Sequence, residues 1–290
     1  MPWFNTQPRR PRNESETWFM QIYLLEQTES VVPTGDNWLG QREIIALHRM
    51  RFAKRRADWR LGRWTAKRAL AACLKLPDSI PALAEVEIIA GSSGAPEAFR
   101  ANAPLPVTIS LSHRAGTAIC SVVRGNARMG CDMELIEAHS QAFVTDYFTA
   151  EEQTLIAHTS AAEKPRIITL LWSAKESASK ALRQGLRLDT RWLSVTKMVG
   201  TWEMHGWNPL HVRYRDGRMF QGWWQGNDWL LRTVVADPAP KPPILLEPSI
   251  PIQVGSGIVT TEVPQPGITA TDLRQAGRCD ATALTLRHTA

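Results

Sequence analysis

Residues 170–182, LLWSAKESASKAL, carry a charge pattern that separates an ordinary amphipathic helix from a functional one. Their apolar residues recur at helical spacing, so the segment predicts an α-helix. Within it, Glu176 stands between Lys175 and Lys180. Glu176 and Lys180 share one helix face, and an i,i+4 ion pair would explain both. A carboxylate between two cations also suits a metal-bound phosphate, with one ligand for the ion and two ammonium groups for the oxygens.

Part of this segment has an echo earlier in the chain. WTAK at residues 64–67 and WSAK at residues 172–175 lie 108 positions apart, and each opens a helix-compatible run. Chance similarity explains four residues as well as common origin does. Together with the strand, helix, strand order of both halves, the echo indicates a duplicated α+β unit. Two such units related by a pseudo-twofold would form a cleft, where ligands often bind.

The pattern of strands and helices favours an α+β fold, because the two types do not alternate strictly. We expect strands at 17–25, 86–90 and in short runs through 107–135, helices at 40–75 and 140–183, a turn-rich stretch at 91–106, and strands again up to 236. The expected parts are an N-terminal extension (1–16), a first α+β subdomain (17–105), a second α+β subdomain with the chemical motifs (106–236), and a Pro-rich tail (237–290) that is partly disordered or laced onto the surface.

Composition indicates a globular protein of the cytoplasm. The chain has 290 residues, 43% of them hydrophobic, and shows neither a secretory signal nor an apolar run of about 18 residues. Its four cysteines are far apart and form no C-x-x-C pair, which argues against a zinc site and for free thiols in a reducing compartment. They are Cys73, Cys120, Cys131 and Cys279. We expect a monomer.

Positive charge is concentrated in one segment. Residues 48–68 hold nine Lys or Arg and one Asp, so their net charge is +8. The whole chain has a net charge of +6, and the remaining residues therefore sum to −2. A local basic patch suits an anionic partner. A cationic stripe at helical spacing is usually a solvated face, but few acidic residues nearby can pair with this one, which favours a bound anion. The stripe consists of Arg56, Arg60, Arg63 and Lys67.

Two carboxylates lie on a predicted strand, GCDMEL at residues 130–135. Asp132 and Glu134 are two apart, so both point to one face of the strand. An edge strand with a solvated polar face explains such a pair, but apolar residues make the opposite face a packed one. A divalent cation relieves repulsion between neighbouring carboxylates, and oxygen ligands without His or Cys indicate Mg²⁺ or Mn²⁺. Glu176 is the candidate third ligand.

Two further residues have both ordinary and functional explanations. Thr149 and Glu152 form an S/T-x-x-E capping box, which accounts for Glu152 without catalysis. His113, in SLSHRAG, is expected at a strand end, where a lone histidine is most often structural. With Arg114 beside it at the mouth of a cleft, His113 would bind phosphate oxygens.

Taken together, GCDMEL, YFTAEE, LWSAKESASK and the upstream SLSH resemble the 4'-phosphopantetheinyl transferase superfamily, of its two-domain type. The resemblance covers residues 17–236, and the combination of G-x-D-x-E with W-x-x-K-E-x-x-x-K is its specific part. It implies transfer of the phosphopantetheine arm of coenzyme A onto a serine of an apo acyl, peptidyl or aryl carrier protein, with release of adenosine 3',5'-bisphosphate. Such carriers serve fatty acid, polyketide and nonribosomal peptide synthesis.

The resemblance also implies roles for individual residues. Asp132, Glu134 and Glu176 would form a Mg²⁺ site beside the pyrophosphate. Lys175 and Lys180 would neutralise the transferring phosphate or protonate the leaving group. Transfer at phosphorus needs this kind of charge neutralisation more than a covalent nucleophile.

The proton acceptor and the coenzyme contacts follow less directly. Either Glu176 or Glu152 would take the proton of the carrier serine. Ser112 and His113 match positions that contact coenzyme A phosphates. By region alone, three basic residues would hold the 3'-phosphate: Arg49, Arg63 and Lys67.

Two other functions compete with the transferase. A catalytically inactive relative of the superfamily would bind coenzyme A or a carrier protein without transfer. The presence of all the motif residues argues against this alternative. A nucleic-acid-binding protein would use the basic segment and the twelve tryptophans, yet the sequence contains no recognised binding module. We therefore expect neither a nucleic acid nor a membrane as partner.

Overall fold

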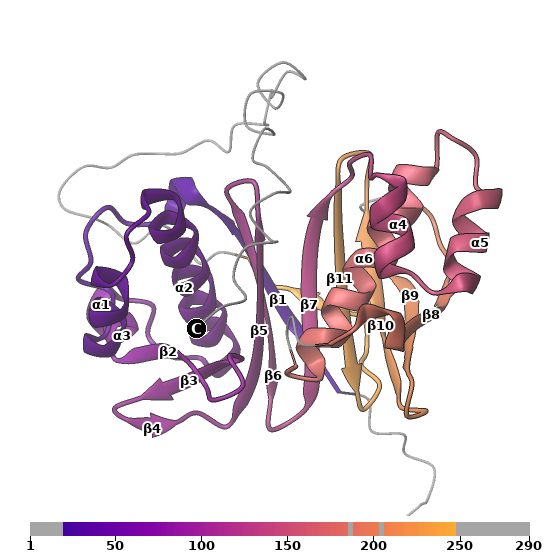
Figure 1. Ribbon diagram of the computed structural model, residues 1–290. Helices are drawn as coiled ribbons and strands as arrows, with labels where there is room; N and C mark the ends of the chain where they lie inside the picture. The colour runs from indigo at the N-terminus through magenta and orange to yellow at the C-terminus, as the bar shows by residue number, and fades with distance from the viewer. Residues whose placement is uncertain (1–19, 185–187, 203–205, 248–290) are drawn as a thin grey trace, which may run out of the picture.

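A computed structural model of the chain describes residues 20–184, 188–202 and 206–247 (Figure 1). The predicted N-terminal extension, Cys279 and the tail from residue 248 lie outside these residues. Within them, every helix is too short or too polar to cross a lipid bilayer.

The first half of the chain packs a long helix on antiparallel strands. Its sheets have the orders β12-β1-β6-β5 and β2-β3-β4, and β3 also contacts β5. The elements are β1 (Tyr23–Thr28), the 3-10 helix η1 (Glu29–Val31), α1 (Gln41–His48), α2 (Ala53–Leu74), α3 (Ile80–Ala84), β2 (Val86–Ala90), β3 (Pro96–Arg100), β4 (Ala103–Pro104), β5 (Val107–Arg114) and β6 (Thr117–Arg124).

The second half repeats this arrangement with one five-stranded sheet of order β7-β11-β10-β9-β8. Its elements, with the closing strand β12, are β7 (Arg128–Leu135), α4 (Gln141–Tyr147), α5 (Ala150–His158), α6 (Lys164–Ala181), the 3-10 helix η3 (Thr190–Trp192), β8 (Leu193–Met198), β9 (Asn208–Tyr214), β10 (Met219–Gly226), β11 (Leu230–Asp237) and β12 (Ile244–Leu245).

The halves stack as four layers: α2, the first sheet, the second sheet and α6 (Figure 1). Alternating residues of the strands fill the spaces between layers. Leu25 and Cys120 pack against α2, whereas Leu24 and Ile119 face the second sheet. These two hydrophobic cores hold α2 and the sheets together, and a third core packs α6 on the second sheet.

Element order is similar in the two halves, but they meet after β6 and not at the predicted boundary of residues 105 and 106, because β5 pairs with β6 and β6 with β1 in the sheet of the first half. In both halves the first strand pairs antiparallel with the last one, β1 with β6 and β7 with β11. Both also contain a hairpin next to the long helix, β2 with β3 and β8 with β9. The fold confirms the predicted α+β class, and the pseudo-twofold relation between the halves stays a prediction.

Two further details differ from the sequence prediction, and a third decides between its two alternatives for the described part of the tail. The first strand begins at Tyr23, later than the predicted 17–25. The stretch 91–106 holds strands β3 and β4, because Pro96 sits at the first position of β3, where no ladder donor is needed. Up to residue 247 the tail is laced onto the first sheet, as one of the two alternatives expected: the backbone N–H of Ile244 donates to Ile22 O at 2.9 Å, and β12 pairs with β1.

Strand β7 approaches helix α6 very closely at Gly130. A Cβ atom at this position would lie 1.9 Å from the carbonyl oxygen of Ser177 and 2.7 Å from the backbone nitrogen of Ala181. Only glycine allows two backbones to come this near. Because Asp132 follows two residues later on the same face, the contact at Gly130 sets its distance from α6.

We predict that Gly130→Ala separates β7 from α6. The added methyl group meets backbone atoms that cannot rotate away, so the free energy of unfolding should fall by about 3 kcal/mol. Urea denaturation measures this change. Gly62→Ala is the matched control, since a Cβ at Gly62 in α2 meets nothing within 4 Å, and it should raise stability by about 0.5–1 kcal/mol. Equal stability of both variants would contradict the close contact.

Candidate functional site

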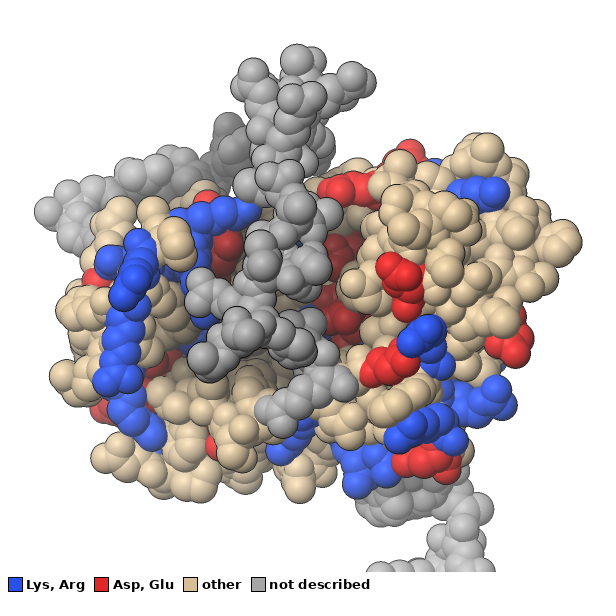
Figure 2. All heavy atoms as spheres, in the orientation of Figure 1, with Lys and Arg blue, Asp and Glu red and all other residues tan. Residues whose placement is uncertain are grey.

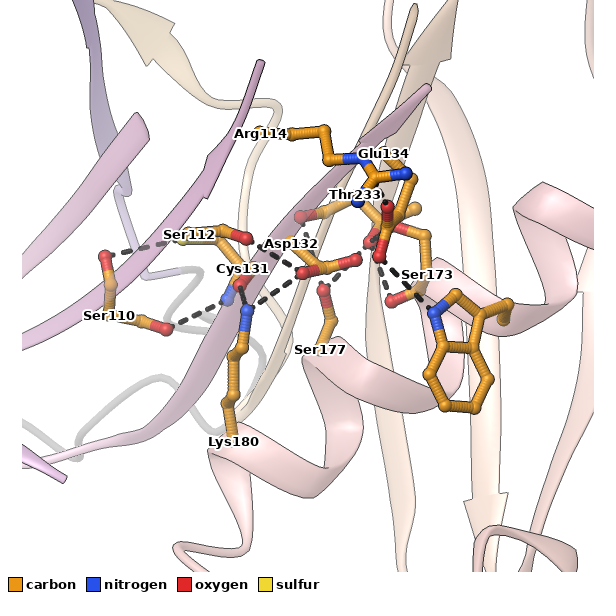
Figure 3. Close-up of polar contacts among 11 residues, drawn as sticks. Ser110, Ser112, Arg114, Cys131, Asp132, Glu134, Ser173, Ser177, Lys180 and Thr233 are labelled. Carbon is orange, nitrogen blue, oxygen red and sulfur yellow. Dashed lines mark hydrogen bonds and ion pairs between the residues drawn. The ribbon is translucent and has the colours of Figure 1, made fainter. Parts of the chain in front are cut away.

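Asp132 is the centre of the site and is buried between β7 and α6 (Figure 3). Its face of β7 looks toward α6, while Met129, Cys131 and Met133 face the first sheet, as the alternation predicts. Asp132 Oδ1 lies 2.8 Å from Lys180 Nζ and accepts a hydrogen bond of 2.8 Å from Ser112 Oγ. Burial works against the Lys180 ammonium, but Asp132, Cys131 and Glu176 together outweigh it, so the pKa of Lys180 is raised.

Glu134 lies on the same face but has different partners. Trp172 Nε1 donates to Glu134 Oε1 at 3.2 Å, and Arg114 Nε is 3.6 Å from Glu134 Oε2. Burial and then the charge of Asp132 raise the pKa of Glu134 to about 7. Repulsion from the neighbouring Asp132 carboxylate therefore adds to burial, and both raise the free-energy cost of ionising Glu134.

Glu176 is half-buried on α6 and, within the described ranges, has no hydrogen bond or ion pair. Burial, with Asp132 next, raises its pKa, and Lys180 opposes the shift. The i,i+4 pair with Lys180, the ordinary alternative for these two residues, is absent, because Lys180 pairs with Asp132 instead. Glu176 therefore keeps both carboxylate oxygens available to a ligand.

The predicted metal site is only partly assembled. In the part of the chain that the structure describes, no three His, Cys, Asp or Glu side chains are close enough to hold a metal ion. Two observations nevertheless fit a divalent cation. Asp132 Oδ2 is buried without a hydrogen-bond partner. Burial and then the charge of Asp132 raise the pKa of both Glu134 and Glu176. Since Mg²⁺ commonly takes one or two carboxylates and completes its shell with phosphate oxygens and water, these residues suit it.

Lys175 and Glu152, two predicted catalytic residues, lie together in a buried ion pair. Lys175 Nζ is 2.6 Å from Glu152 Oε2 and also donates to the carbonyl oxygens of Tyr147 and Thr190. All three ammonium donors are thus occupied. Burial lowers the pKa of Lys175, and Glu152 opposes the shift. This geometry favours a structural role for both residues over contact with a phosphate or a carrier serine.

A pocket of about 410 Å³ adjoins the acidic site. Helix α2 contributes Trp59 and Arg63, and the end of β5 contributes Ser112 and His113. The guanidinium of Arg63 lies over the Trp59 ring at 4.5 Å, and its Nε is buried without a hydrogen-bond partner. Burial lowers the pKa of Arg63 to about 10, so it stays protonated at neutral pH. Partial desolvation lowers the pKa of His113.

Charges are segregated on the face shown in Figure 2. Acidic residues gather along the border between the two halves, and Lys and Arg form a stripe over the outer part of the first half. Arg49 is exposed and lines a neighbouring basic surface pocket with Arg51 and Arg55, and the two pockets share Phe52 and Arg55.

Two of the four members of the predicted cationic stripe of α2 pair with acidic residues from other segments. Arg60 pairs with Asp36, and Lys67 Nζ lies 2.6 Å from Glu43 Oε2 with both side chains fully buried. In this structure Lys67 has no access to the 3'-phosphate that the resemblance assigned to it. Arg63 is the member of the stripe that faces the pocket.

Sequence reasoning missed the polar residues that support the site. Trp172 donates to Glu134, and Ser173, Ser177 and Thr233 form a buried hydrogen-bonded group between α6 and β11. Arg114, which the sequence placed beside His113 as a phosphate contact, lies against Glu134 and Glu137 instead. Trp172 and both serines lie within the motif segment itself, so their motif positions were the available signal. Thr233 has no such signal, because it meets α6 only through the pairing of β11 with β7.

A buried carboxylate and lysine beside a cationic pocket suit group transfer at phosphorus. Comparison with known families agrees: residues 128–214 match the model of the 4'-phosphopantetheinyl transferase superfamily, which confirms the superfamily resemblance. The matched segment runs from β7 to β9 and contains Asp132, Glu134, Glu176 and Lys180. It supports transfer of phosphopantetheine to carrier proteins in general. A search of curated proteins finds no match.

We predict that Lys180→Met destabilises the protein. The change leaves the buried Asp132 carboxylate without its cation, which should cost about 2 kcal/mol after allowance for the partial exposure of Lys180. Adding Asp132→Asn should recover part of the loss, because the neutral amide needs no cation. Urea denaturation gives both values. Lys197→Met, at an exposed position of β8, is the control. A loss no larger than that of the control would mean that the Asp132–Lys180 pair contributes nothing.

Proposed function

We propose that the protein transfers the 4'-phosphopantetheine arm of coenzyme A to a serine of an apo carrier protein and releases adenosine 3',5'-bisphosphate. The observation that carries this proposal is the buried Asp132 with its unpaired Oδ2, beside Lys180 and Glu176. These residues lie in the segment that matches the superfamily. Acyl, peptidyl and aryl carriers all fit the proposal.

Mg²⁺ or Mn²⁺ would be held at the acidic face. Asp132 would be its main ligand through Oδ2, and Glu134 and Glu176 would bind it directly or through water. When bound, the ion neutralises charge on the pyrophosphate of coenzyme A. The raised pKa values of Glu134 and Glu176 support this assignment, since a cation is what stabilises carboxylates that burial and mutual repulsion disfavour.

Lys180 and Glu176 are the residues that we assign to the reaction. The Lys180 ammonium is fixed by Asp132 and the carbonyl oxygen of Cys131 at 3.0 Å. Its remaining donor can stabilise negative charge that develops on the leaving phosphate. Glu176 has a raised pKa and no partner among the described residues, so it suits the general base for the serine hydroxyl better than the bonded Glu152.

The pocket between α2 and β5 would bind the adenosine bisphosphate part of coenzyme A. Arg63 and His113 offer donors to phosphate oxygens, and the Trp59 ring offers an apolar surface. Ser112 joins this pocket to the acidic site, because its hydroxyl donates to Asp132. One ligand that occupies both places would span the border between the halves.

We predict that the purified protein adds one phosphopantetheine group to at least one apo carrier protein. The assay incubates it with coenzyme A, Mg²⁺ and a panel of acyl, peptidyl and aryl carriers, and intact mass spectrometry follows the carrier. Asp132→Ala and Glu176→Ala should lower the rate at least about a thousandfold while circular dichroism stays unchanged. Chelation of the metal should stop the reaction reversibly. Binding of coenzyme A without transfer to any carrier would instead identify a catalytically inactive relative of the superfamily.

We predict that Arg63→Met weakens coenzyme A binding. Loss of a charge-assisted contact to a phosphate should raise the KM for coenzyme A about tenfold, with a smaller change in kcat, because Arg63 is remote from the reacting phosphorus. Steady-state kinetics with a fixed carrier concentration measures both. Arg100→Met is the control, since Arg100 pairs with Glu85 outside the pocket. An unchanged KM would remove Arg63 from the binding site.

A further inference from the structure

Each half of the protein contains one fully enclosed glutamate–lysine pair, and the two pairs are built alike. In the first half Glu43 Oε2 lies 2.6 Å from Lys67 Nζ, and in the second half Glu152 Oε2 lies 2.6 Å from Lys175 Nζ. Each glutamate is the third residue of a short helix, α1 or α5, and each lysine belongs to a long one, α2 or α6.

Each glutamate caps its own helix and also reaches the next hairpin. Glu43 Oε2 accepts from Gly40 N at 2.9 Å, and Glu152 Oε2 accepts from Thr149 N at 2.9 Å. The other carboxylate oxygen accepts from a strand at 2.9 Å in both halves. The donor is Ile88 N of β2 for Glu43 and Val195 N of β8 for Glu152.

Each lysine also donates to two backbone carbonyl oxygens at matching places. One acceptor precedes the short helix, Trp38 or Tyr147, and the other precedes the hairpin strand, Leu83 or Thr190. A tryptophan three residues before each lysine packs edge-on against the first of these: Trp64 on Trp38 at 5.2 Å, and Trp172 on Tyr147 at 5.1 Å. The WTAK and WSAK echo therefore marks one structural unit that occurs twice.

The reactive residues lack this duplication. On α6, Lys175 is followed by Glu176 and, five positions later, Lys180; on α2, Lys67 is followed by Arg68 and Ala72. Arg68 pairs with Asp78 at 2.9 Å. The glutamate–lysine pair is thus present in a half without Glu176 or Lys180, so catalysis is not needed to explain it in the other half.

We propose that Glu152 and Lys175 are positioning residues, which lock α6 to α5 and β8 and act on the reaction only through the placement of α6. The part of this inference that concerns catalysis rests on the proposed function. A buried ion pair with every donor and acceptor used is rigid, and removal of one member leaves an uncompensated charge. Since Glu176 is the neighbour of Lys175, any shift of α6 displaces it.

A set of single and double variants tests this role. Glu152→Gln and Lys175→Met should each lower Tm by about 10 °C, because each leaves one buried charge without a partner. Below the melting range, each should lower kcat about tenfold through misplacement of α6. The double variant Glu152→Gln/Lys175→Met contains no buried charge at this place, so it should recover most of the Tm and most of the kcat.

The first half supplies the matched control. Glu43→Gln, Lys67→Met and their double variant should show the same loss and recovery of Tm. Recovery of Tm without recovery of kcat in the Glu152/Lys175 double variant would show that the pair takes part in the chemistry and would overturn the proposal. Single variants with unchanged Tm would also overturn it. If the unaltered protein transfers nothing, the proposed function fails, while the Tm comparison still decides whether the lock exists.

Discussion

The site depends on one electrostatic constraint, a carboxylate buried between strand β7 and helix α6. A charge at Asp132 is tolerated in this layer only if a cation accompanies it. Lys180 provides that cation because Gly130 lets the backbones of β7 and α6 approach each other closely. The pair uses one oxygen of Asp132 and leaves the other without a hydrogen-bond partner, and this second oxygen is the one that we propose as the metal ligand.

The features that were predictable from sequence are those set by local periodicity. Alternation along GCDMEL placed Asp132 on one face of its strand and the sulfur-containing side chains on the other, and the structure agrees. Capping of α5 by Glu152 follows from spacing alone. The charge partners of α2 did not follow, because Asp36 and Glu43 reach Arg60 and Lys67 only after the chain folds back. Two members of the basic stripe, for which the sequence showed no acidic partner, are therefore paired in the structure.

The sequence assigned Lys175 to the reaction for the same reason: local patterns do not contain its tertiary contacts. Its place beside Glu176 gives it the appearance of a reactive residue, but a helix turns by about 100° per residue, so neighbours in sequence face different environments. Only the tertiary contacts distinguish the enclosed lysine from Lys180, which stays partly exposed. The echo of WTAK in WSAK held this information, since Lys67 occupies the same enclosed place in a half without the acidic site.

The two halves share an architecture but contribute different parts of the site. The second half carries the acidic face, the first half contributes the cationic pocket, and Ser112 lies between them. The most direct test of this account is the anomalous scattering of Mn²⁺ in crystals grown with coenzyme A. The account predicts a Mn²⁺ peak about 2.2 Å from Asp132 Oδ2, with a phosphate oxygen of the coenzyme as a further ligand. Coenzyme A bound elsewhere, with Asp132 still held only by Lys180 and Ser112, would contradict it.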